Sequence, residues 1–80
     1  MEVNVVREAR HRQPFRPFSL RLADGRELQV PHPDFVAVSP RRVIVINPQD
    51  ESHSILEPLL IVSVEYVGGS QPAGNQQGTA

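Results

Sequence analysis

Residues 14–30 read PFRPFSLRLADGRELQV, and apolar and polar side chains alternate on both sides of the Asp24-Gly25 pair. Alternation with a period of two is typical of β-strands that bury one face. An Asp-Gly pair between two such runs indicates a hairpin. We therefore predict a proline-braced entry into a β-hairpin and, for the whole chain, a small β-rich domain.

The hydrophobic pattern also selects the length of the hairpin loop. A two-residue loop would place Leu20 opposite Gln29 and set a core residue against a polar one. A three-residue loop places Leu20 opposite Leu28 and keeps the apolar side chains on one face. We predict the three-residue loop, with Gly25 in the left-handed position of a type I turn with a G1 bulge. The same register pairs Phe18 with Val30 and Leu22 with Arg26.

A helix is expected before the hairpin. Residues 2–13 place Val5, Val6 and Ala9 at helical spacing, in a narrow apolar stripe that must dock on the rest of the domain. At the other end, residues 68–80 read GGSQPAGNQQGTA, which is too polar to offset the entropy of ordering it. We predict a single domain over residues 1–67, followed by a disordered tail at 68–80.

Short apolar runs separated by prolines predict further strands after the hairpin. They lie at residues 43–46, 53–57 and 60–67, after a bend at residues 31–34 from which Phe35, Val36 and Val38 return to the core. In the last run, Leu60, Val62, Val64 and Tyr66 are expected on one face. Because the chain is short, we expect one strongly bent five-stranded antiparallel sheet or small barrel rather than two separate sheets.

Positive charge is concentrated in the first third of the chain. The net charge is −1 and no lysine is present, but six of the eight arginines lie between positions 7 and 26. Only Glu8 and Asp24 oppose them in that window. Arginine forms bidentate contacts with phosphate. The candidate residues for binding an anion or nucleic acid are Arg7, Arg10, Arg12, Arg16 and Arg21. The alternative is a solvated helix face with intramolecular Glu–Arg pairs.

A second candidate surface is apolar. Residues 43–46, Val-Ile-Val-Ile, are apolar on both faces. This pattern indicates either a central strand that its own domain covers on both faces or a strand used in an interface. A folded part of roughly 65 residues has a small core, and association with a partner is one route to stability. The candidate interaction residues are Phe15, Val43, Ile44, Val45 and Ile46, and the expected partner is a second copy or another protein.

Several functional classes find little support. The chain has no cysteine, no nucleophile elbow and no phosphate-binding glycine loop. His32 and Asp34, with His53 or His11, match no zinc-binding spacing, and His-Pro-Asp also forms turns. No signal peptide and no membrane span is recognisable. We predict no enzymatic activity, no metal, no cofactor, no membrane partner and a cytoplasmic location.

Two resemblances bear on the fold. A leading helix followed by five strands resembles the Sm-like barrel, which includes the bacterial RNA chaperone of that class, and the SH3-like barrel is a close alternative. The similar segments are Phe18–Gly25 and Leu60–Val64. The bacterial chaperone carries a Tyr-Lys-His run where this chain has Leu56–Leu59, so the resemblance transfers no RNA-contact residue.

The chain also resembles a group of short bacterial proteins without an assigned activity. The shared pattern is Gln-Pro-Phe-x-Pro-Phe, Leu-Ala-Asp-Gly-Arg and His-Pro-Asp-Phe, matched here by Gln13–Phe18, Leu22–Arg26 and His32–Phe35. Taken together, the sequence predicts a non-enzymatic module for oligomerisation or protein interaction. The alternative is binding of single-stranded nucleic acid, such as RNA, through the arginine-rich N-terminal face.

Overall fold

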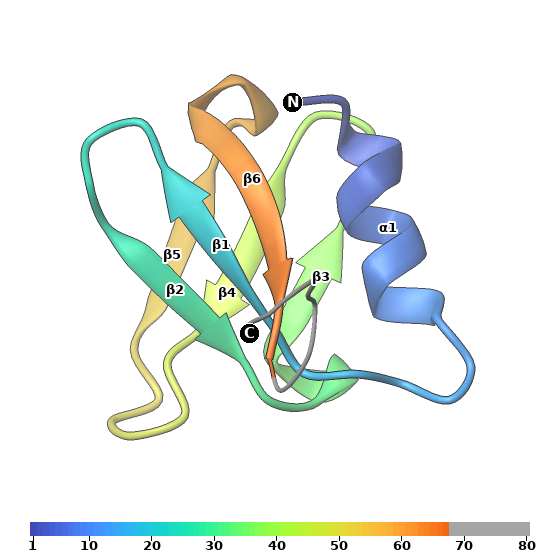
Figure 1. Cartoon of the computed structure of the whole chain (residues 1–80). Helices are drawn as coiled ribbons and strands as arrows, with labels where there is room; N and C mark the ends of the chain where they lie inside the picture. The colour runs from blue at the N-terminus through green and yellow to red at the C-terminus, as the bar shows by residue number, and fades with distance from the viewer. Residues whose placement is uncertain (68–80) are drawn as a thin grey trace, which may run out of the picture.

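The computed structural model describes residues 1–67, which form one α-helix, two short 3₁₀ helices and two three-stranded antiparallel sheets (Figure 1). The first sheet has the order β2-β1-β6 and the second the order β3-β4-β5. The elements are α1 (Val3–His11), β1 (Phe18–Leu22), β2 (Glu27–Val30), η1 (Pro33–Phe35), β3 (Val36–Val38), β4 (Val43–Ile46), β5 (His53–Leu56), η2 (Pro58–Leu60) and β6 (Ile61–Tyr66). The predicted disorder of residues 68–80 lies outside the described residues.

The prediction of a mainly β domain with one N-terminal helix is confirmed, whereas the single five-stranded sheet or closed barrel is not. Within residues 1–67 there are six strands, and no ladder joins the two sheets. Prolines stand at both places where the chain passes between the sheets, since Pro31 and Pro33 follow β2 and Pro58 follows β5. Proline has no N–H to donate, so the ladder ends there and a short 3₁₀ turn replaces it.

The hairpin has the predicted register. Phe18 lies opposite Val30 and Leu20 opposite Leu28. The Leu22 amide donates to the Arg26 carbonyl at 2.8 Å, and the Gly25 amide donates to the Leu22 carbonyl at 3.0 Å. Gly25 has φ +94°, the left-handed conformation that the three-residue loop requires. Asp24 accepts the Arg26 amide at 3.0 Å, which lowers the pKa of its carboxyl group.

The core lies between the two sheets and α1. Val6 and Ala9 are completely buried on the inner face of the helix, whereas Val5, predicted in the same apolar stripe, is 43% exposed. The helix is also shorter than the predicted 2–13, because it ends at His11. The other buried apolar residues are Phe18, Leu20, Leu22, Val30, Val36, Val43, Val45, Leu56 and Ile61.

The prediction for the face of the last strand is wrong in its first half. Ile61 is buried, while Leu60 and Val62 are exposed. The register shifts along β1 between Arg21 and Leu22, where β1 pairs with β6. This irregularity inserts one extra residue, Val62, and reverses the alternation that a regular strand would show.

The helix covers one of the two gaps between the sheets. Figure 1 shows α1 beside β3 and β6, and the Arg10 Nε atom donates to the Val36 carbonyl at the start of β3, at 2.8 Å. The Met1 ammonium donates to the Pro58 carbonyl at 3.0 Å. The gap on the other side, between β2 and the β4–β5 hairpin, remains an open cleft of about 260 Å³.

Candidate functional site

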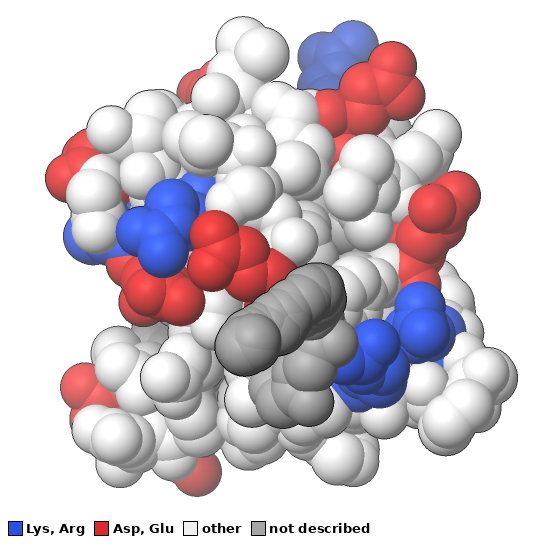
Figure 2. Space-filling view, in the orientation of Figure 1, with Lys and Arg blue, Asp and Glu red and all other residues white. Residues whose placement is uncertain are grey.

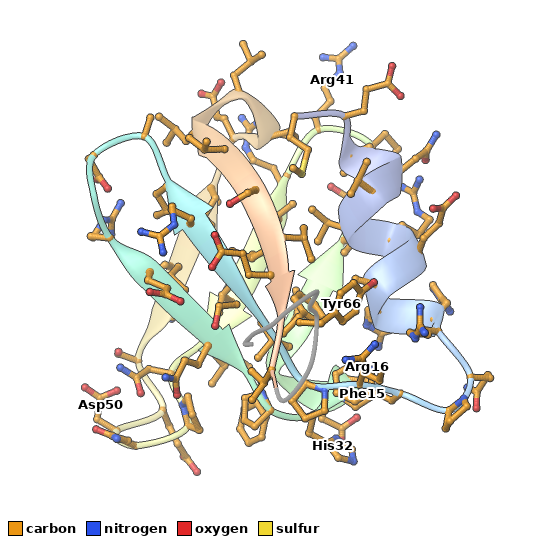
Figure 3. The ribbon with its side chains drawn as sticks, in the orientation of Figure 1. Phe15, Arg16, His32, Arg41, Asp50 and Tyr66 are labelled. Carbon is orange, nitrogen blue, oxygen red and sulfur yellow. The ribbon has the colours of Figure 1, made fainter. Side chains whose placement is uncertain are left out.

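Two arginines and a tyrosine meet where the end of α1 approaches the end of β6. The guanidinium carbons of Arg12 and Arg16 each lie 5.2 Å from the centroid of the Tyr66 ring, within the range of a cation–π interaction. Arg12 immediately follows α1, Arg16 precedes β1, and Tyr66 is the last residue of β6. Figure 3 shows Arg16 next to Tyr66 in this region. We call Arg12, Arg16 and Tyr66 the Arg–Tyr cluster.

A row of planar rings runs from Tyr66 through Phe18 and Phe15 to His32. Tyr66 meets Phe18 edge-on with centroids 6.2 Å apart, because β1 and β6 place these two residues opposite each other. Phe18 lies 5.9 Å from Phe15, which lies 6.4 Å from His32. Phe18 is fully buried, Phe15 is half-buried against the core, and the His32 side chain is 61% exposed. Phe15, predicted as an interaction residue, therefore already packs partly within its own domain.

The other predicted arginines have partners of their own. Arg7 donates to the Asn4 side chain, and Arg10 donates to a backbone carbonyl of β3. Arg21 lies on the outer face of the first sheet, 3.1 Å from Glu65 and 3.7 Å from Glu27. The five arginines thus do not form one surface, and only Arg12 and Arg16 share a contact residue.

The Arg21–Glu65 pair shifts the pKa values of both side chains on the outer face of the first sheet. The hydrogen bond from Arg21 lowers the pKa of Glu65, and a second hydrogen bond from the Ser63 hydroxyl, at 3.1 Å, acts in the same direction. The same pair raises the pKa of Arg21. In Figure 2, blue side chains mix with red ones on the left of the molecule, and further blue side chains lie at the lower right, below a red one.

The strand at residues 43–46 has a buried face and an outer face. Val43 and Val45 belong to the core, whereas Ile44 and Ile46 are half-buried on the opposite face. Ile44 pairs across the sheet with Ile55, which is 60% exposed, and on its other side with the exposed Ala37. The second face of this strand is thus only partly covered by the described residues.

The cleft between β2 and the β4–β5 hairpin was not foreseen from the sequence, because a closed sheet was expected there. Amide and hydroxyl side chains dominate its wall. Its lining residues are Glu27, Leu28, Gln29, Val45, Asn47, Pro48, Gln49, Ser52 and Ser54. These residues bring the Glu27 carboxylate together with amide and hydroxyl groups, so the cleft offers hydrogen-bond donors and acceptors.

Metal-ligating residues do not converge in the part of the chain that the structure describes. No group of three or more His, Cys, Asp or Glu side chains gathers within residues 1–67. His32 lies 3.6 Å from Asp34, and its Nδ1 atom accepts the Asp34 amide, which is the turn interaction expected for His-Pro-Asp. No helix among these residues is long and apolar enough to cross a membrane.

Comparison with known proteins adds no relative, since no family model, curated protein or solved structure matches the chain.

Proposed function

We propose that the protein is a non-enzymatic interaction module that associates with a second copy of itself through the outer face of the β3–β4–β5 sheet. The observation that carries the proposal is the pair of Ile44 and Ile55 on that face, with Ile55 60% exposed. Ile46 adds a third isoleucine, half-buried on the same face. Contiguous exposed apolar side chains on a small domain are typical of interaction sites.

The charge of this face favours a second copy as the partner. The outward-facing residues of the three strands are Ala37, Ile44, Ile46, His53 and Ile55. None of them is an acid, a lysine or an arginine, so a two-fold axis through this face opposes no fixed like charges. Association would also cover apolar surface that a domain of this size leaves exposed, and so raise its stability.

The contribution of Ile55 can be estimated. Full burial of an isoleucine side chain is worth about 1.5–3 kcal/mol, so covering the 60% that remains exposed contributes about 0.9–1.8 kcal/mol per copy. A symmetric dimer contains the residue twice. Replacing it by serine should therefore weaken association roughly 20- to 400-fold.

Sedimentation equilibrium of the full chain over a range of concentrations tests the proposal. The unmodified chain should form a dimer, and Ile55→Ser should be a monomer at the same concentrations. Val62→Ser is the matched control, because Val62 is an exposed β-branched residue at 57% exposure on the other sheet. A monomeric unmodified chain, or equal weakening by both substitutions, would contradict the proposal.

A further inference from the structure

We propose that the Arg–Tyr cluster is a binding site for single-stranded nucleic acid, in which Arg12 and Arg16 contact phosphates while the neighbouring rings stack on bases. This inference does not rest on the proposed self-association. It uses a different surface, at the junction of α1, the entry to β1 and the end of β6.

The first support is that the guanidinium groups of Arg12 and Arg16 contact the Tyr66 ring and form no ion pair within the described residues. Within residues 1–67 the ion pairs are formed by Arg21, Arg26 and His32, and none involves Arg12 or Arg16. Both are instead held against the Tyr66 ring. A cation–π contact uses the charge of the guanidinium and leaves its in-plane N–H donors available. Those donors match the oxygens of a phosphate group.

The second support is the rigidity of the ring that holds them. Tyr66 is positioned by its pairing with Phe18 across β1 and β6, and Phe18 is fully buried. The core therefore fixes the ring, and the ring in turn restricts two side chains that would otherwise be mobile. Binding a phosphate then costs less side-chain entropy than it would at two free surface arginines.

The third support distinguishes nucleic acid from a free phosphate ion. Next to the arginines, the half-buried Phe15 ring lies 6.4 Å from the exposed His32 ring. Figure 3 shows Tyr66, Arg16, Phe15 and His32 following one another along this side of the molecule. Cationic side chains interleaved with accessible planar rings are the combination that single-stranded nucleic acids recognise, because each nucleotide offers a phosphate and a π-face.

Fluorescence anisotropy with a labelled oligouridine tests the phosphate contacts. Two contacts predict that log K falls with log salt with a slope of about −1.4, a loss of roughly sevenfold between 50 and 200 mM salt. Arg12→Gln and Arg16→Gln should each reduce the slope by about 0.7. Arg21→Gln is the matched control, because Arg21 is held by Glu65, and it should leave the slope unchanged. Absence of binding at low salt, or equal effects of all three substitutions, would overturn the proposal.

A second pair of probes tests the bases. An abasic oligomer of the same length carries the same phosphates, and we expect the oligouridine to bind at least about fivefold more tightly, because stacking contributes for each base. His32→Ala should remove part of that difference and leave binding of the abasic oligomer unchanged. Equal affinity for both oligomers, or displacement of both by inorganic phosphate at constant ionic strength, would show a simple anion site and overturn the assignment to nucleic acid.

Discussion

The hairpin turn allows a stability prediction that depends only on the conformational energy of the backbone. Gly25 has φ +94°, and a Cβ atom added there would meet no other atom within 4 Å. Gly25→Ala therefore introduces no clash, and its cost is that of holding an L-residue in the left-handed conformation, roughly 1–2 kcal/mol. Part of this is offset because alanine restricts the unfolded chain by about 0.4–1 kcal/mol.

A net loss of about 1 kcal/mol corresponds to a fall in Tm of about 4–8 °C for a domain of this size. Thermal unfolding followed by circular dichroism, at one fixed protein concentration, measures it. Gly25→Asn is the control, because asparagine tolerates the left-handed region better and should lose less than half as much. If the Tm of Gly25→Ala stays within about one degree of the unmodified chain, or if the asparagine variant falls as far, the turn assignment is refuted.

Three further predictions concern packing and charged groups in the rest of the domain. Arg21→Gln should lower the Tm at neutral pH, because it removes the hydrogen bond from Arg21 to Glu65. Arg21 lowers the pKa of Glu65 in the folded state, so the stability that the pair contributes is present above the ordinary carboxyl pKa and is lost as the pH falls through the lowered value. The Tm difference between the two proteins should therefore vanish in acid. Arg10→Ala removes the hydrogen bond to the Val36 carbonyl and should cost about 1 kcal/mol in urea unfolding. Phe18→Ala should cost about 3–5 kcal/mol and leave much of the chain unfolded by circular dichroism.

The parts of the fold that depend on local pattern could be predicted, and the parts that depend on distant pairing could not. The hairpin register follows from parity around the Asp-Gly turn, and it is confirmed. The division into two sheets depends on which strands pair after Pro31 and Pro58. The prolines show where the strands end, but they do not show which strands pair. The burial of Ile61 in place of Val62 results from an irregularity in the pairing of β6 with β1, and alternation within residues 60–67 carries no sign of it.

The contacts of the arginines in the candidate site also depend on distant strand pairing and could not be predicted from the sequence. Arg21 and Arg16 are equally basic in the sequence, but β1 and β6 place Arg21 beside Glu65, whereas the approach of the hairpin entry to the end of β6 places Arg16 against Tyr66. Glu65 and Tyr66 are neighbours in the chain, and their side chains point to opposite faces of the strand. Which arginine is neutralised is thus determined by the parity of a strand more than 40 residues away.

The net charge of the protein sharpens the test of the nucleic-acid site. A strongly basic domain attracts any polyanion at long range, and the salt dependence of its binding then reports many scattered contacts. This chain has a net charge of −1, and Glu65 and Glu27 stand on the outer face of the same sheet that carries Tyr66. Long-range attraction of a polyanion is therefore expected to be weak, and the proposed binding requires the contacts at the Arg–Tyr cluster itself. A slope much steeper than about −1.4 would mean that more cations take part than the two at Tyr66, and it would contradict a site of this size.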